Sequence, residues 1–292
     1  MREGRSLGFY LLAGFFGLYV LFLYGPMLAI FVLSFQGPDG GLTFPMNGLS
    51  TVWFSKLFAG SGIVDIGAAF IRSLQLGLVV MVVTVVLSVA AGMAFRKRFV
   101  GAGLLFYTAI ASLIVPSIVT SLGIALGFRL LDDGVQALGF AEEGTMMGLF
   151  TSGLGAHLTW TLPFGLLIMF AILNRFDARL EEAARDLGAT PWQSFRYVVL
   201  PIILPSVVGI GLFGFTLSWD ELARSSQAIG AVNTLPLELQ GLTTTVTKPD
   251  IYALGTVTSA VSFLAIFSGL FAIRALQKRQ ARRGSDAGQG MQ

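Results

Sequence analysis

Long apolar runs separated by short polar stretches dominate the chain. A membrane-spanning α-helix needs about 20 mainly apolar residues. Runs of this length lie at residues 8–34, 68–95, 102–130, 149–174, 198–219 and 251–275. The pattern therefore predicts an all-α, polytopic membrane protein with six transmembrane helices, which we expect to form a single transmembrane domain over residues 1–292.

Proline and glycine punctuate these runs. Pro116 and Pro163 interrupt the third and fourth runs, which membrane helices tolerate when neighbouring groups satisfy the freed carbonyls. Small residues recur within the runs, at Gly123, Gly127, Gly209, Gly211 and Gly214. Such positions let helix backbones approach closely, and we interpret them as packing positions rather than ligand contacts.

The composition agrees with a membrane protein. Hydrophobic residues make up 54% of the 292 residues and charged residues 12%, whereas a soluble domain has roughly 25% charged residues. The N-terminal run, from Leu7 to about Phe35, is too long for a signal-peptide core, so we expect a retained helix. The absence of cysteine excludes disulfides and cysteine-ligated metal sites.

Lysine and arginine are unevenly divided among the polar stretches. With the N-terminus in the cytoplasm, 14 of the 19 lie on the cytoplasmic side. The others are Lys56, Arg72, Arg129, Arg224 and Lys248. This bias predicts that both termini are cytoplasmic. It also explains the net charge of +3 without a nucleic-acid partner, since the basic tail KRQARRG is expected to lie at lipid headgroups.

The predicted outer loops span about 36–66, 131–148 and 220–250. The second and third are acidic, with Asp132, Asp133, Glu142, Glu143, Asp220, Glu221, Glu238 and Asp250. These carboxylates could attract a cation or a basic partner, or they could simply be solvated loop residues.

One predicted cytoplasmic stretch, LEEAARDLGATPWQSFRYVVLP (Leu180–Pro201), breaks the apolar pattern. Its neighbourhood carries eight charged residues: Arg175, Asp177, Arg179, Glu181, Glu182, Arg185, Asp186 and Arg196. We expect two short helices joined by a tight turn, over about residues 176–197, that lead into the fifth span.

The stop and start signals of these two helices are specific. Asp177 suits a helix N-cap, and Gly188 suits the left-handed residue that ends a helix. Thr190 and Gln193 form a capping-box pattern, with Pro191 in the first turn.

The first short helix also carries an apolar stripe at helical spacing, formed by Leu180, Ala183, Ala184 and Leu187. Two interpretations are open. The small residues could form a docking surface for another protein, or the stripe could pack against the inner membrane ends of the same chain. The residues alone favour neither.

A known pattern covers this stretch. Its members are Glu182, Ala183, Ala184, Gly188, Val198, Leu200 and Pro201, and at this spacing they resemble the EAA loop in the membrane subunits of bacterial type I ABC importers. In that family the loop is a coupling helix, here about residues 178–189, that inserts into a groove on the ATPase subunit. The resemblance implies that the ATPase-coupling residues are Glu181, Glu182, Ala183, Ala184, Asp186 and Gly188.

The resemblance extends over about 200 residues. The stretches AHLTWTLPF, FTLSWDELA, NTLPLEL and TKPDIYALGTV are similar to the second permease of spermidine/putrescine-type importers. Two places depart from that group. Ser117 follows Pro116 where an acidic residue is common, and Asp220, Glu221 and Leu222 stand where paired aspartates followed by Phe are common. The first departure removes a carboxylate that would suit a cationic substrate.

A candidate substrate path is predicted at the end of the fifth span. Asp220 and Glu221 come directly after Trp219, and an ionisable pair there is costly unless it faces a water-filled cavity or a partner. Trp219 could add a cation–π contact with a substrate ammonium group. Alternatively, the pair marks the end of the span and meets bulk water. His157 could bind substrate or titrate, or it could be a hydrogen-bonded packing residue.

Several enzyme classes are excluded. None of the four lysines lies in a G-x-x-x-x-G-K-[ST] loop, so we do not expect this chain to hydrolyse ATP or to hold a cofactor or metal. The resemblance implies that separate ATPase subunits use ATP and magnesium. Ser152 and His157 are too close on one helix to form a protease dyad.

The resemblance also implies the setting and partners. We expect a multi-pass subunit of the bacterial inner (plasma) membrane that moves a small solute, such as a polyamine or another small organic amine. Its partners would be a homologous second permease, an ATPase dimer and an extracytoplasmic binding protein docked on the outer loops. An ion-gradient-driven secondary transporter would require intramembrane ionisable residues, which are few here. A non-transporting scaffold would have no ATPase partner.

Overall fold

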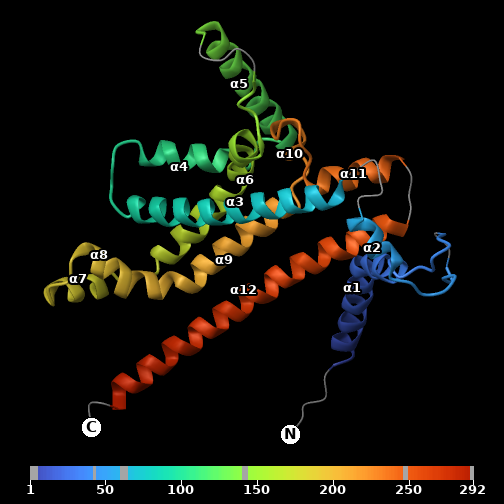
Figure 1. The fold of residues 1–292 in the computed structure, drawn as a ribbon. Helices are drawn as coiled ribbons and strands as arrows, with labels where there is room; N and C mark the ends of the chain where they lie inside the picture. Colours follow the sequence, from blue (N-terminus) through green and yellow to red (C-terminus); the bar gives the residue numbers. More distant parts are fainter. Residues whose placement is uncertain (1–5, 42–43, 60–64, 140–143, 246–248, 290–292) are drawn as a thin grey trace. The chain divides into compact units, whose positions relative to one another are not determined.

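The computed structural model describes residues 6–41, 44–59, 65–139, 144–245 and 249–289. These ranges are helical apart from loops and one isolated β-bridge between Gln36 and Leu49, which confirms the all-α class (Figure 1). The helices are α1 Leu7–Leu33, α2 Val52–Phe58, α3 Ile66–Phe95, α4 Ala102–Ala111, α5 Ser117–Ala137, η1 Leu149–Gly153, α6 Leu154–Leu173, α7 Arg179–Asp186, α8 Pro191–Ser194, η2 Phe195–Val199, α9 Leu200–Trp219, α10 Ser225–Ala228, α11 Leu235–Thr245 and α12 Pro249–Gln289.

Some sequence assignments fall outside the description. Glu142, Glu143 and Lys248 lie outside the described ranges, and the side chains of the basic tail beyond Lys278 are not described. The described residues form two compact units, which are treated separately. One unit comprises residues 1–67 and 239–261, and the other comprises residues 68–238 and 262–292. The single-domain organisation therefore stays a prediction.

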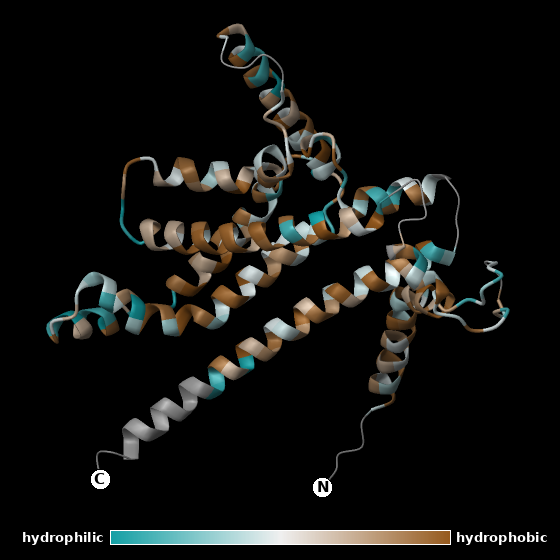
Figure 2. Cartoon of the chain, viewed as in Figure 1, coloured by the Kyte–Doolittle hydropathy of each residue, from teal (hydrophilic) through white to brown (hydrophobic). Residues whose placement is uncertain are grey.

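Five of the six predicted runs form continuous helical stretches that are long and apolar enough to cross a membrane. They are Leu7–Leu33, Ile66–Phe95, Leu149–Leu173, Pro191–Trp219 and Pro249–Lys278. Figure 2 shows the apolar residues along these helices and the mainly hydrophilic α7 and α8 that precede α9. The fold is compatible with six membrane-crossing segments in which the third is divided in two.

The third run is not the single helix that residues 102–130 suggested. Helix α4 ends at Ala111, and α5 begins after Pro116 and continues to Ala137. Proline has no N–H to donate and disfavours helical geometry at the preceding residue, so a break at Pro116 follows from its chemistry. The prediction of an interruption at Pro116 is confirmed, and the predicted end at residue 130 is seven residues early.

The expectation of an interruption at Pro163 is wrong, because Pro163 lies inside the continuous helix α6. Proline at that position leaves the carbonyl of Thr159, four residues earlier, without its helical donor. The Ser112 hydroxyl donates to this carbonyl at 2.7 Å. A side chain from the loop after α4 therefore satisfies the freed group, which is how membrane helices tolerate proline.

The larger unit is centred on the packing of α6 and α9 with α3. Its buried apolar cluster comprises Met169, Leu173, Val199, Ile203 and Ile210, with Val85, Val89 and Met93 of α3 packed against it. A buried hydrogen bond of 2.7 Å between the Thr84 and Thr161 hydroxyls also joins α3 to α6.

Glycines permit this close packing. A Cβ placed at Gly165 of α6 would overlap Ser88 Oγ and lie 3.2 Å from Ile210. The predicted packing role is supported at Gly211 and Gly214, whose positions lie against Met81 of α3. At Gly123, Gly127 and Gly209 a Cβ would meet no described atom within 4 Å, so those glycines make no close approach within the described chain.

The smaller unit is anchored by Gln36, which is buried. The Trp53 indole N–H donates to the Gln36 carbonyl at 2.8 Å, and the Gln36 amide donates to the Gly41 carbonyl at 2.8 Å. These bonds fix the loop between α1 and α2. In the same unit, Ile251, Ala253 and Leu254 are buried along the first turns of α12.

The glycine contact at Gly165 generates a stability prediction. Gly165→Val should force α6 away from Ser88 and destabilise the protein by about 1–3 kcal/mol, the usual cost of overpacking. The matched control is Gly155→Val on the same helix, where a Cβ would meet nothing within 4 Å. Thermal unfolding in detergent should show a lower midpoint for Gly165→Val than for Gly155→Val. Equal midpoints would contradict the packing described.

Candidate functional site: a charged helix–turn–helix and a buried polar cluster

The first short helix of the charged segment, α7, begins close to its predicted start. Its N-cap is Ala178 rather than Asp177, which corrects the predicted cap by one residue. Asp177 still acts on the helix start, because its carboxylate accepts the Arg179 backbone N–H at 3.0 Å. The carboxylate reaches two residues along the chain, as aspartate does in local turns.

The turn after α7 has the predicted glycine geometry. Gly188 has φ +86°, in the left-handed region that favours glycine. The Gly188 N–H donates to the Arg185 carbonyl at 2.8 Å, and the Ala189 N–H donates to the Ala184 carbonyl at 3.0 Å. This pair of bonds is the Schellman arrangement that ends a helix.

The second short helix, α8, begins with the predicted capping box. The Gln193 N–H donates to Thr190 Oγ1 at 3.3 Å, while the Thr190 N–H donates to the Gln193 side-chain oxygen at 2.8 Å. Pro191 occupies the first turn. Helix α8 continues through the π-helical turn η2 into α9, so the charged segment is joined directly to the fifth predicted span.

Most of the predicted coupling residues lie on an open face of α7. Glu182, Ala183, Asp186 and Gly188 are exposed, and Ala184 is half-buried. The apolar stripe is open as well, since Leu187 is 90% exposed. Leu180, Ala183 and Leu187 of the stripe are exposed within the described residues and only Ala184 is half-buried, so most of the stripe is open to a partner.

Glu181 differs from its neighbours, because its carboxylate is bound within the chain. Arg96 Nη1 donates to Glu181 Oε1 at 2.8 Å and Arg96 Nη2 donates to Glu181 Oε2 at 2.9 Å. The side chains of Arg96 and Glu181 are 23% and 12% exposed. The sequence interpretation counted Arg96 only as one of the basic residues that set the orientation.

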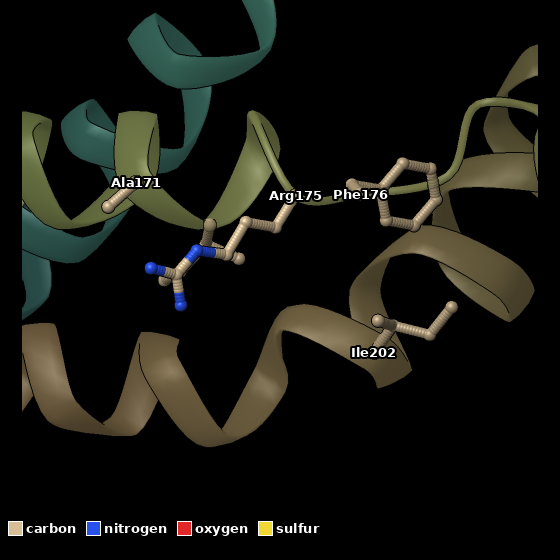
Figure 3. Close-up of a pocket in the computed structure, with 5 residues that line it drawn as sticks. Ala171, Arg175, Phe176 and Ile202 are labelled. Atoms are coloured by element: carbon tan, nitrogen blue, oxygen red, sulfur yellow. The ribbon is translucent and has the colours of Figure 1, made fainter.

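A pocket of about 320 Å³ lies beside this segment, between the end of α6 and the start of α9. Its walls are mainly apolar, and its lining residues are Ala171, Ile172, Arg175, Phe176 and Ile202. In Figure 3 the Arg175 and Phe176 side chains extend from the chain after α6 in different directions. Phe176 also contacts Arg96, whose guanidinium lies 5.3 Å from the centre of the Phe176 ring.

His157 is part of a buried polar cluster where α6 meets the end of α9. Its Nδ1 lies 2.8 Å from Ser218 Oγ and its Nε2 lies 2.9 Å from Ser225 Oγ. Both ring nitrogens are therefore hydrogen-bonded, and the side chain is buried. These contacts fit the interpretation of His157 as a hydrogen-bonded packing residue. Ser152, by contrast, donates to the Ala228 carbonyl and forms no dyad with His157.

Arg224 is the centre of the same region, although the sequence assigned it only to an outer loop. The guanidinium donates to Ser117 Oγ at 2.7 Å and to Thr159 Oγ1 at 3.3 Å, and it lies 3.4 Å from Glu221 Oε2. It also lies 4.5 Å from the centre of the Trp160 ring. Its side chain is 1% exposed.

This environment has electrostatic consequences. Burial lowers the pKa of Arg224, and the Glu221 carboxylate opposes that change. Glu221, whose side chain is 11% exposed, thus compensates a buried cation. Asp220 is exposed, and partial desolvation raises the pKa of its carboxyl. Asp220 is therefore the more accessible of the two predicted path carboxylates.

Trp219 is buried rather than open to a substrate. Its ring stacks on Phe215 with centroids 5.8 Å apart and meets the edge of Phe70 at 5.4 Å. Its indole N–H has no hydrogen-bond partner among the described residues. The cation–π contact of this cluster is made by Trp160 with Arg224, two residues that sequence reasoning did not select. In the described part of the chain, no group of three or more potential metal ligands occurs.

Comparison with known proteins gives a family match. The family described as binding-protein-dependent transport system inner membrane component matches residues 84–283. The spermidine/putrescine transport system permease protein PotC of Escherichia coli (strain K12) is 30% identical over 268 residues, covering 90% of this chain and 93% of that protein. The putrescine transport system permease protein PotI of the same strain is 29% identical over 272 residues, covering 90% and 92%.

Solved structures show the same fold at lower sequence identity. A bacterial ABC transporter for import of the acidic polysaccharide alginate has a TM-score of 0.62 and 14% identity, covering 93% of this chain and 95% of that one. The same kind of transporter, in complex with an alginate pentasaccharide-bound periplasmic protein, has a TM-score of 0.60 and 15% identity, covering 91% and 92%. The MetNI methionine ABC transporter has a TM-score of 0.54 and 20% identity, covering 70% and 93%.

Proposed function

The chain belongs to the family of binding-protein-dependent transport system inner membrane components, and on this premise we propose how it is driven and what it carries. It is a permease subunit of an ABC importer. Separate ATPase subunits dock on α7, a homologous permease completes the pathway, and an extracytoplasmic binding protein delivers the solute. The ATPase subunits bind and hydrolyse ATP with magnesium, and this chain forms part of the path of the solute through the membrane.

The observation that carries the docking proposal is the exposed face of α7. Glu182, Ala183 and Asp186 are exposed, and Leu187 beside them is an apolar residue left in solvent. A small exposed helix with small and apolar residues gains free energy when a partner groove covers it. The same segment continues through α8 and η2 into the buried core at Val199, so a displacement of α7 would be transmitted to the membrane helices.

The proposed solute is a polyamine or another small organic amine. The relatives PotC and PotI are named as spermidine/putrescine and putrescine permeases. Asp220 offers the accessible carboxylate for an ammonium group. Glu221 balances Arg224, and Trp219 and His157 are buried and support the cluster. Ser117 stands at the position where an acidic residue is common in that group. Its hydroxyl carries no negative charge and accepts a hydrogen bond from Arg224.

The proposed setting is the bacterial inner membrane with both termini in the cytoplasm. Five described helices can span a membrane by length and composition, and α4 with α5 supplies the third predicted crossing. The excess of Lys and Arg on one side supports the orientation. In this orientation α7 is cytoplasmic, on the side where ATP is available.

Substitutions on the docking face should uncouple transport. Glu182→Lys reverses a charge on the exposed face, and Gly188→Val strains the left-handed turn by about 1 kcal/mol or more. In the complex reconstituted into vesicles, both substitutions should reduce solute uptake and the stimulation of ATP hydrolysis by solute-loaded binding protein. The chain should still insert into the membrane.

Two matched controls lie outside α7 on the same predicted side of the membrane. Lys97→Glu reverses a charge at an exposed position after α3, and Gly101→Val strains another left-handed glycine, with φ +87° and no neighbour within 4 Å. Both controls should leave stimulation unchanged. Full uptake by Glu182→Lys and Gly188→Val would refute the assignment of α7 as the docking element.

The orientation can be tested in intact cells, because the natural chain has no cysteine. Single cysteines in Ser6→Cys and Ser285→Cys should resist a membrane-impermeant thiol reagent until the membrane is permeabilised. Asp133→Cys, on the predicted outer side, should be labelled without permeabilisation. Ready labelling at Ser6→Cys or Ser285→Cys would overturn the proposed topology.

Removal of the Asp220 charge should weaken uptake of a cationic solute. We expect Asp220→Asn to lower polyamine uptake several-fold, since one ion pair in a partly desolvated site contributes about 1–2 kcal/mol. Because the pKa of Asp220 is raised, acidification removes its charge at a higher pH than for an ordinary aspartate. Uptake by the natural chain should therefore decline on acidification at a pH above that at which an ordinary aspartate is protonated, and uptake by Asp220→Asn should lack this decline.

Glu221→Gln is the companion variant. It leaves buried Arg224 without its carboxylate, so assembly must be measured separately from uptake. Unchanged uptake by Asp220→Asn and by the double variant, over a range of solute concentrations, would rule out a path role for these carboxylates.

A further inference from the structure

The charged segment is held to the membrane helices at two points of different character. One attachment is apolar: Val199 is fully buried, and Phe195 packs on the same cluster as Met169 and Met93. The other is the Arg96–Glu181 pair. Among the described residues, no other ion pair or side-chain hydrogen bond joins residues 177–199 to a helix outside the segment.

The Arg96–Glu181 pair has the geometry of a rigid connection. Its two parallel bonds, of 2.8 and 2.9 Å, fix both the distance and the relative orientation of the two side chains. Arg96 is held on other sides as well. Its guanidinium lies 5.3 Å from the centre of the Phe176 ring, and its Nη1 lies 3.9 Å from Met93 Sδ. Both side chains are largely shielded from water, so salt screens the pair less than an open surface pair.

The two residues of the pair belong to different structural elements. Arg96 directly follows Phe95, the last residue of the 30-residue helix α3, and the Phe95 ring packs on Phe170 of α6 at 5.2 Å. Glu181 lies in the first turn of α7, next to the exposed docking residue Glu182. The pair therefore joins the cytoplasmic end of a membrane helix to the element on which an ATPase would act.

Apart from contacts with α8 and η2 of the same segment, the chain joins α7 to the membrane helices through two non-helical connections. The C-terminal end of α7 meets the Gly188 turn, and its N-terminal end follows residues 174–178, which lie outside helices. Glycine allows backbone rotation more freely than other residues. Without the ion pair, α7 could pivot about these connections, and a force applied to its exposed face would rotate α7 instead of displacing α3.

We propose that Arg96 is a positioning residue: its ion pair with Glu181 makes α7 and the end of α3 move as one rigid body. This inference rests on the proposed ATPase docking and adds the route by which a movement of α7 is transmitted to α3. The apolar attachment at Val199 joins the segment to α6, α9 and the side of α3, and the ionic attachment adds a directed bond between α7 and the end of α3.

The test uses the full transport complex, reconstituted with its ATPase and binding protein. Arg96→Gln and Glu181→Gln should each lower solute transported per ATP hydrolysed by about tenfold, within the usual range of coupling between sites. The ATPase should still co-purify, and the apparent KM for solute-loaded binding protein should be unchanged. The exchanged variant, Arg96→Glu with Glu181→Arg, should recover most of the lost ratio. Arg96→Lys keeps the charge without the two-pronged bond and should fall between.

Lys97→Gln is the matched control, since it removes an exposed positive charge from the adjacent position. It should transport with the natural ratio. A natural ratio in Arg96→Gln, or no recovery in the exchanged variant, would overturn the inference while leaving the proposed function intact. If the unmodified chain neither binds an ATPase nor supports uptake, the proposed function fails first, and the inference fails with it.

Discussion

The cost of an unpaired charge away from water is the constraint on which this structure depends. Charged residues at the bilayer centre cost several kcal/mol, so long runs of the chain are apolar and the charges gather between them. Where a charge is buried, it is paired: Arg224 is 1% exposed and lies beside Glu221. Where a charge is partly shielded at a helix end, it is also paired, as Arg96 is with Glu181. The other charges on α7 are exposed, so they remain free to meet water or a partner.

Local features of the sequence predicted their structures well. The capping box of Thr190 and Gln193, and the left-handed turn at Gly188, depend on residues within a few positions and occur as expected. Proline was read less accurately. Pro116 lies at a helix break, where α5 begins, but Pro163 lies inside a continuous helix, because the Ser112 hydroxyl from another part of the chain satisfies the carbonyl that Pro163 frees.

The site residues that sequence reasoning missed are those defined by long-range contacts. Arg96 meets Glu181 across 85 positions, and Arg224 meets Ser117 across 107. In the sequence both arginines appear only as charges that orient the chain, and nothing near them names the partner. A basic residue beside a predicted span is equally suited to lipid headgroups, to water or to a buried carboxylate. Only the packing of α3, α5 and α6 decides between these outcomes.

The central claim is that the exposed face of α7 is where ATP-driven movement enters this chain. The most direct measurement is site-specific photocrosslinking of the assembled complex in its native membrane. A photoreactive residue replacing Leu187, which is 90% exposed, should form a covalent adduct with an ATP-hydrolysing subunit, whereas the same residue replacing Leu138, which is 72% exposed and follows α5, should not. An adduct with that subunit from Leu138, and none from Leu187, would contradict the account.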